Sequence, residues 1–140
     1  MDIKENYFLK EHLNDMIITS ITMEDLTKEN NIPFNSYKTF INWETINHVF
    51  EIFFDFENNE QIVRMALEKS KISLSEDLYI YLDCDVPLLQ VKQSFFFNNW
   101  EDFYACNGYT GFVVVSKDTN YILEFTENGK LYSNFIIALT

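Results

Sequence analysis

Residues that break, hinge or cross-link a chain are scarce in this sequence. Its 140 residues include three glycines, two prolines and two cysteines. So few glycines and prolines argue against disorder and low complexity, and 140 residues suffice for one domain, residues 1–140, with a substantial core. Two cysteines do not make a disulfide framework, and each adjoins apolar or aromatic residues. We therefore expect Cys84 and Cys106 to be buried, reduced thiols.

Long apolar runs and positive charges are also scarce. No run approaches the roughly 18 apolar residues that a membrane-spanning helix needs, and the amino-terminal residues lack the apolar stretch of a signal peptide. We therefore expect a cytoplasmic protein. The formal net charge is −12, from 22 acidic and 10 basic residues. Contact with nucleic acid or with an anionic membrane surface is disfavoured, because phosphate binding needs a basic patch.

The excess of acidic residues favours a positively charged protein as partner, since opposite electrostatic fields steer two proteins together. An acidic surface can also serve only to keep a protein soluble.

Aromatic residues, by contrast, are plentiful: they make up 17% of the chain, with 14 phenylalanines and 8 tyrosines. Rings of this size bury large areas, so a stable and compact core is expected.

Hydrophobic periodicity predicts both helices and strands. Helices are expected at residues 4–16, 23–30, 58–70 and 95–106, the last one capped by Asn98 or Asn99 and stopped at Asn107–Gly108. Residues 17–23 fit a short strand or the end of a helix. Strands are expected at residues 78–82, 88–91, 112–115, 121–126 and 131–136.

Residues 40–56 fit two structures. A helix would place Trp43, Ile46 and Phe53 on one stripe, whereas a strand would place Phe50, Ile52 and Phe54 on one side. We favour a helix through about residue 47 and a strand after it, and leave open whether residues 48–56 are helix or strand.

The carboxy-terminal part of the chain fixes the expected fold class. Asn128–Gly129 is a strong hairpin signal, because both central positions of a type I′ turn need positive φ. The fold class expected is α+β, with an antiparallel sheet that ends in a three-stranded meander over residues 111–137 and is flanked by helices.

Candidate catalytic or metal sites are weak. Asp83, Cys84 and Asp85 would need a distant His12 or His48 to complete a ligand set, so we expect solvated carboxylates in a turn and no metal ion. Neither cysteine lies in a motif that pairs it with a histidine for nucleophilic catalysis. No glycine-rich loop with a lysine is present to hold a nucleotide, so no cofactor is expected.

Acidic residues gather in two regions. Between Lys38 and Arg64 the chain has five acidic residues and no Lys or Arg, and between Lys71 and Lys117 it has six against Lys92 alone. If these regions lie side by side, they form a broad negative field that suits a basic protein. Exposed aromatic residues would anchor that interface, with Tyr79, Tyr81, Tyr104 and Tyr109 as candidates. The expected contact residues are Asp55, Glu57, Glu60, Asp83, Asp85, Glu101, Asp102 and Tyr104.

The segment NNWEDFYACNGYTGFVVVS (residues 98–116) and the following NYILEFTENGKLYSNF (residues 120–135), with the length and the acidity, carry a resemblance to a known group. The chain resembles the small acidic immunity proteins of bacterial contact-dependent inhibition and other polymorphic toxin systems. Because that group includes several unrelated folds, the resemblance implies a role more than a structure. It implies binding to a cognate toxin domain, often a basic nuclease, and occlusion of its active site or an adjacent surface.

We therefore expect a non-enzymatic inhibitor of a cognate toxin. Two other classes stay open. A carboxylate-based hydrolase would show a deep pocket that holds two carboxyl groups with perturbed pKa values. A structural or adaptor subunit, or a homodimer, would show a large exposed apolar patch.

Overall fold

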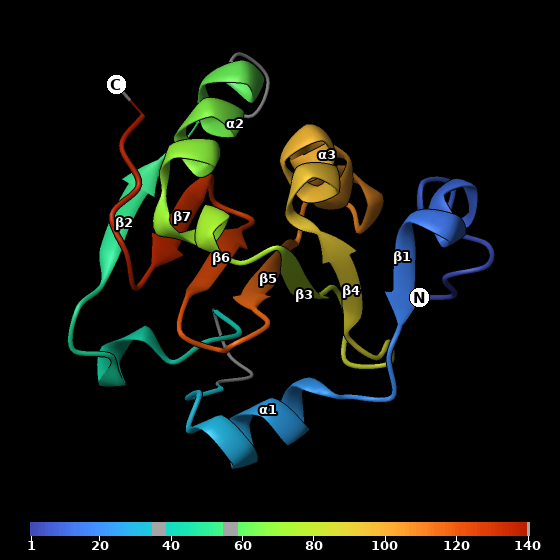
Figure 1. Ribbon diagram of the computed structural model, residues 1–140, viewed down its shortest axis with the longest axis horizontal. Helices are drawn as coiled ribbons and strands as arrows, with labels where there is room; N and C mark the ends of the chain where they lie inside the picture. The colour runs from blue at the N-terminus through green and yellow to red at the C-terminus, as the bar shows by residue number, and fades with distance from the viewer. Residues whose placement is uncertain (35–38, 55–58, 140) are drawn as a thin grey trace.

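Seven strands form one antiparallel sheet in the order β1-β4-β3-β5-β6-β7-β2 (Figure 1). The structure, a computed structural model, describes residues 1–34, 39–54 and 59–139. The strands are β1 (Met16–Ile18), β2 (Phe50–Phe53), β3 (Asp77–Tyr81), β4 (Leu89–Lys92), β5 (Gly111–Ser116), β6 (Ile122–Thr126) and β7 (Lys130–Ser133). All six neighbouring pairs are antiparallel, so the predicted α+β class is confirmed.

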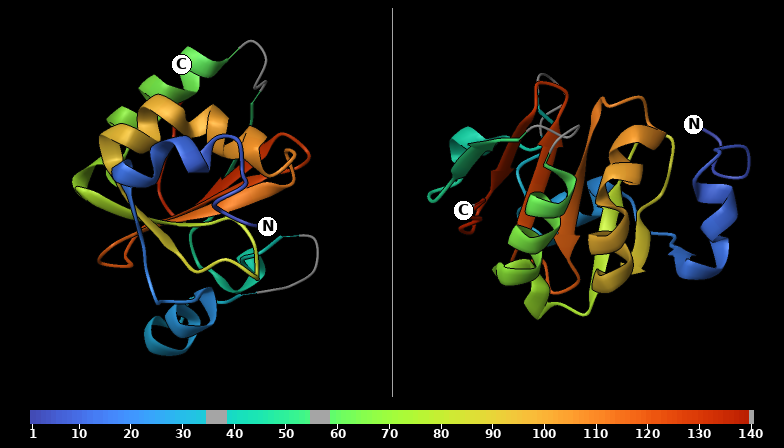
Figure 2. Two further views of the ribbon diagram at one scale, coloured as in Figure 1. Left: turned by 90° about the vertical axis from the view of Figure 1, so that its right-hand side faces the viewer. Right: turned by 90° about the horizontal axis from the view of Figure 1, so that it is seen from above.

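Helices cover both faces of this sheet (Figure 2). Helices α2 (Glu60–Lys69) and α3 (Gln93–Cys106) lie on one face, together with the 3-10 helix η1 (Leu9–Asp15), and α1 (Met23–Asn30) lies on the other. Two further 3-10 helices are η2 (Trp43–Thr45) and η3 (Lys71–Leu74). None of the helices in the described part of the chain has the length and apolar character needed to span a bilayer.

The predicted meander is formed by β5, β6 and β7, which are consecutive in the sheet. Its second turn differs from the predicted type I′ form. Gly129 has positive φ (75°), whereas Asn128 does not, and Phe125 pairs with Leu131. This register leaves a three-residue loop, in which a single left-handed residue is required. The hairpin prediction is confirmed and the turn type is wrong.

The face under α2 and α3 is packed with aromatic rings. Trp100 stacks on Phe125 with the ring centroids 5.5 Å apart, and Phe112 stacks on the same ring at 4.7 Å. Phe54, which follows β2, meets Trp100 and Phe125 edge to face. These rings are buried and remove large apolar areas from water, so the face of the sheet under α2 and α3 forms the main core.

The opposite face is covered by α1 and by the irregular segment that contains η2. One carboxylate of β6, that of Glu124, is 2% exposed and anchors this segment. It accepts hydrogen bonds from the backbone N–H groups of Phe40 (2.8 Å) and Ile41 (3.1 Å) and from the Trp43 indole N–H (2.9 Å).

These bonds engage backbone donors of residues 40 and 41 from outside the segment. The predicted helix up to residue 47 is wrong, because Ile41 forms a β-bridge with Phe34 and the Asn42 N–H donates to the Pro33 carbonyl oxygen, and only one turn of 3-10 helix, η2, follows. The strand predicted after residue 47 is present as β2 (Phe50–Phe53).

Two predicted helices have different boundaries in the structure. The one expected at residues 4–16 is a 3-10 helix, η1, with non-helical backbone at His12, and Met16–Ile18 continues as the edge strand β1. The helix expected to be capped by Asn98 or Asn99 begins earlier, at Gln93, and is interrupted at Asn99 (φ −131°, ψ 18°). Asn99 breaks α3 rather than starting it.

Candidate functional site

The structure divides the predicted contact residues. Asp55 and Glu57 lie outside the described residues. Glu60, Glu101 and Asp102 lie on helices α2 and α3, whereas Asp83 and Asp85 lie on the turn between β3 and β4.

Tyr104, expected as a contact residue, lies in the core. Its side chain is 1% exposed, and its phenol donates a hydrogen bond to the Thr126 carbonyl oxygen at 2.6 Å. Burial raises the pKa of this phenol. Tyr79 and Tyr81 are buried as well, because they face the sheet side that α1 and the η2 segment cover. These three rings therefore cannot anchor a partner.

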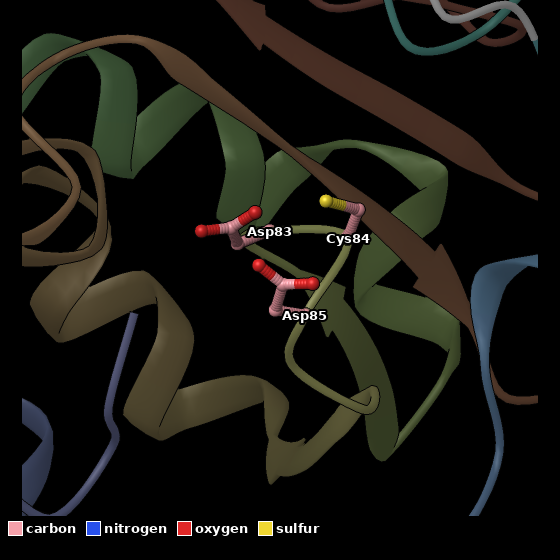
Figure 3. Close-up of side chains that lie close together, drawn as sticks. All are labelled: Asp83, Cys84 and Asp85. Carbon is pink, nitrogen blue, oxygen red and sulfur yellow. The ribbon is translucent and has the colours of Figure 1, made fainter.

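The β3–β4 turn brings Asp83, Cys84 and Asp85 together, with their oxygen and sulfur atoms within 4.8 Å of one another (Figure 3). The prediction that Cys84 is buried is wrong, since the turn projects it into solvent, whereas Cys106 is buried as expected. A hydrogen bond to Asp83 is the main cause that raises the pKa of the Cys84 thiol. The amino-terminal ammonium of Met1 lies 3.5 Å from Asp83 Oδ2. Among the described residues no histidine joins this group, so the turn lacks the fourth protein ligand of a structural zinc site.

The remaining acidic residues form a crowded group at the junction of α2 and α3. Glu60 is the first residue of α2, and its carbonyl oxygen accepts a hydrogen bond from the Trp100 indole N–H at 3.1 Å. That bond joins the start of α2 to α3 just after the break at Asn99. Burial raises the pKa of Glu101, and the carboxylates of Glu60 and Asp102 raise it further. Both charged neighbours that shift this pKa are negative.

Two exposed tyrosines lie near the end of α3, and Tyr7 is the one close to Asp102. Tyr7 is 59% exposed and Tyr109 is 40% exposed. Asn6 donates a hydrogen bond to the Cys106 carbonyl oxygen (2.9 Å), which holds the amino-terminal segment against the end of α3. Burial raises the pKa of Tyr7, and smaller contributions come from Cys106, Tyr109 and Asp102, which places these groups near one another.

Tyr109 is held in an unusual conformation. Its φ is 62°, in the left-handed region that side chains other than glycine, asparagine and aspartate seldom adopt. The ring meets Tyr104 edge to face, at 5.3 Å between centroids, so the core fixes its direction. Strained, exposed residues of this kind are concentrated at functional sites.

We call this surface the α3 patch, and it consists of Tyr7, Glu60, Glu101, Asp102 and Tyr109. Glu60 is also ion-paired with Arg64, as its four-residue spacing predicts. Carboxylates accept hydrogen bonds from lysine and arginine, and tyrosine rings pack on guanidinium groups or on apolar surface. The patch therefore has the chemistry to bind a basic protein surface.

Tyr7 is the residue of the α3 patch that the sequence interpretation missed. In the helix predicted for residues 4–16, Phe8, Leu9 and His12 would lie on one apolar stripe, and Tyr7 would lie outside it. A tyrosine off the apolar stripe of an amphipathic segment is a usable signal for an exposed ring.

One cavity contains two carboxylates, as a hydrolase would require. It has a volume of about 530 Å³, and its walls include Asp15 and Asp77. Asp15 lies 3.0 Å from the ring of His12, and Asp77 lies 3.0 Å from the ammonium of Lys92. Each carboxylate therefore has its own basic partner.

Comparisons of the chain with protein-family models, with curated proteins and with solved structures gave no match.

Proposed function

We propose that this protein is a cytoplasmic, non-catalytic immunity protein, which binds the basic toxin domain of a bacterial effector through the α3 patch and occludes its active site or substrate surface. The observation that carries the proposal is the position of the exposed Tyr7 and Tyr109 near Asp102, which lies beside Glu101, whose pKa is shifted by no charged neighbours other than carboxylates. Such a surface is electrostatically costly in the free protein, and lysine or arginine side chains of a partner relieve that cost.

The two kinds of residue have different roles in the proposed complex. Tyr7 and Tyr109 supply the desolvated centre, because tyrosines contribute large contact areas and are enriched among residues that dominate binding energy. Glu101 and Asp102 pair with basic side chains of the toxin. The net charge of −12 speeds encounter with a basic domain, and this steering weakens as salt screens it.

The test requires a toxin-like domain encoded by a gene next to that of this protein, and its binding to the purified chain is measured by calorimetry. Asp102→Lys is expected to weaken the complex at least tenfold, because it places a cation where the toxin presents cations. Tyr109→Ala is expected to weaken it by a similar factor. Glu29→Lys is the matched control, since Glu29 is an equally exposed carboxylate on α1, and it should change the affinity less than threefold.

Two results would contradict the proposal. The first is that co-expression with the neighbouring toxin gives neither a complex nor protection of the cell. The second is that Asp102→Lys and Glu29→Lys weaken the complex equally, which would show that overall charge, and not the α3 patch, decides binding.

A homodimer is the second candidate, and the edge strand β1 favours it. Ile17 is 58% exposed and Ile18 is 47% exposed on this strand, which pairs with β4 on one side. Exposed apolar edge strands are templates for pairing with another chain. Sedimentation velocity would show a dimer that Ile17→Lys dissociates, and a monomer at all concentrations would exclude this candidate.

A further inference from the structure

A groove with a volume of about 670 Å³ lies between α2, β2 and the carboxy-terminal tail. Figure 1 shows this tail running between β2 and α2. We call the feature the tail groove. It reaches Lys69, the last residue of α2, whereas the α3 patch includes Glu60, the first residue of the same helix. The tail groove therefore extends along α2 from Ile62 to Lys69, and the α3 patch includes only the first residue of this helix.

The walls of the tail groove are largely apolar and partly open to solvent. Ile62 and Met65 of α2 are 42% and 45% exposed, Phe50 of β2 is 37% exposed, and Ile136 of the tail is 68% exposed. These side chains come from three separate elements and converge on one hollow. Apolar surface that is gathered in this way marks a binding site more often than isolated exposed residues do.

The charged side chains at the rim of the tail groove are basic, although the chain as a whole is acidic. Lys69, Lys71 and His48 line it, and none of its described lining residues is acidic. Lys92 and Lys130 form salt bridges, whereas Lys69 and Lys71, like Lys4, Lys10 and Lys117, form none among the described residues. Two of these unpaired lysines lie beside one apolar hollow and give it a local positive charge in a protein with 22 acidic residues.

We propose that the tail groove binds a small amphiphilic anion, namely an unbranched aliphatic chain with one carboxylate. The aliphatic chain lies along Ile62, Met65 and Ile136, and the carboxylate pairs with Lys69 and Lys71 at the rim. The volume falls within the range of about 300–1,000 Å³ that is typical of small-ligand sites. A second copy of this chain is a poorer occupant, because two bodies of charge −12 repel each other.

The test is a titration of the purified chain with dodecanoate below its micelle concentration, followed by amide chemical shifts in NMR spectra. We expect saturable shifts at α2 residues from Ile62 to Lys69 and in residues 134–139. Dodecyltrimethylammonium is the reversed-charge probe. Overall charge would favour that cation on this acidic protein, so tighter binding of the anion identifies the lysine rim.

The variant Lys69→Gln/Lys71→Gln is expected to weaken dodecanoate binding at least tenfold, since it removes both charged partners. Lys117→Gln is the matched control, because Lys117 is an exposed lysine outside the tail groove, and it should change the affinity less than twofold. Met65→Glu changes a half-exposed helix position and should abolish binding while the far-ultraviolet spectrum stays unchanged.

Three results would overturn the proposal. They are an absence of saturable shifts around the tail groove, equal affinities of the double variant and of Lys117→Gln, and a concentration-dependent dimer that Met65→Glu dissociates. The third result would show that a second copy occupies the groove. None of these measurements involves the toxin, so their failure leaves the proposed immunity function unaffected.

Discussion

The two faces of the sheet are covered by different means. On one face, α2 and α3 place aromatic and aliphatic side chains against the strands, and Trp100 and Phe125 lie at the centre of the packed rings. On the other face, α1 and an irregular segment cover the strands, and the carboxylate of Glu124 fixes that segment. Both faces bury apolar side chains, and the second face depends in addition on one polar anchor.

The difference shows how a short chain covers a sheet on both sides. A helix satisfies its own backbone, so it needs only an apolar stripe to pack. An irregular segment must find acceptors for its backbone N–H groups wherever it is buried. Glu124 provides two of these acceptor positions and a third for the Trp43 indole, at the price of holding a carboxylate away from water.

The largest effect is expected from Trp100→Ala, on the face that α2 and α3 cover. Trp100 is fully buried, stacks on Phe125 and donates a hydrogen bond to the Glu60 carbonyl oxygen. The cavity and the lost contacts should lower the free energy of unfolding by about 4 kcal/mol. Urea unfolding followed by circular dichroism measures this change. The control is Tyr7→Ala, an exposed ring, and a similar loss in both variants would contradict the packing argument.

On the second face, Glu124→Ala should be nearly as damaging although it removes no large apolar side chain. It leaves the N–H groups of Phe40 and Ile41 and the indole of Trp43 without their acceptor, which should lower the free energy of unfolding by about 3 kcal/mol. Quenching of Trp43 fluorescence by acrylamide should rise because the segment loosens.

Glu127→Ala is the matched control for that variant. Glu127 lies just past the end of β6 and is exposed, so its removal should change stability by less than about 0.5 kcal/mol. Equal losses in the two variants would show that the anchor contributes nothing beyond an ordinary surface carboxylate.

Much of the first face could be predicted from the sequence, and little of the second. The stripe of Val63, Ala66 and Leu67 marks α2, and alternation marks the meander, because both patterns follow from packing against one apolar surface. Alternation also separates Glu124 from Leu123 and Phe125, which in a half-exposed sheet would place it in solvent. A covering segment whose Trp43 is 81 residues away from Glu124 in the chain leaves no trace in that local pattern.

The α3 patch could be predicted from the sequence only in part. Glu60, Glu101 and Asp102 were expected from charge clustering, and the structure places them together at one helix junction. Tyr104 was expected beside them and is buried, because it lies with Trp100 and Phe103 on the apolar side of α3 that packs on the sheet. The amino-terminal segment that brings Tyr7 to this junction is held by a contact between Asn6 and Cys106, which no local pattern indicates.

The Glu124 carboxylate should also have a smaller effect, on how the free energy of unfolding depends on pH. Burial raises the pKa of Glu124, and its three hydrogen bonds offset this only in part. The folded protein therefore holds the proton more tightly than the unfolded chain does. The contribution of Glu124 to stability is greatest below the ordinary glutamate range and falls as pH rises through the raised pKa.

The measurement is the free energy of unfolding of the wild type minus that of Glu124→Gln, determined by urea at several pH values. This difference should fall as pH rises across that window and then stay constant. Groups such as Asp118, whose pKa is lowered by a hydrogen bond from Ser116, act in the opposite direction but in both proteins, so they cancel. A difference that rises with pH would contradict the assignment.

The smallest effect is expected at α1, the short helix of the second face. Thr22 and Asp25 form a capping box, in which the Asp25 N–H donates to Thr22 Oγ1 at 3.1 Å and the Thr22 N–H donates to Asp25 Oδ2 at 2.9 Å. Thr22→Ala removes the first of these bonds and should lower stability by about 1 kcal/mol. Thr27→Ala is the control, because alanine is the better helix former inside the same helix.

Hydrogen exchange of the α1 amides separates a local from a global response. With α1 buried only through Met23 and Leu26, the helix can open while the rest of the sheet stays folded. Thr22→Ala should therefore speed exchange in α1 more than in β5 or β6. If exchange in β5 and β6 rises by the same factor, α1 unfolds only together with the whole sheet, and the second face is as cooperative a part of the fold as the first.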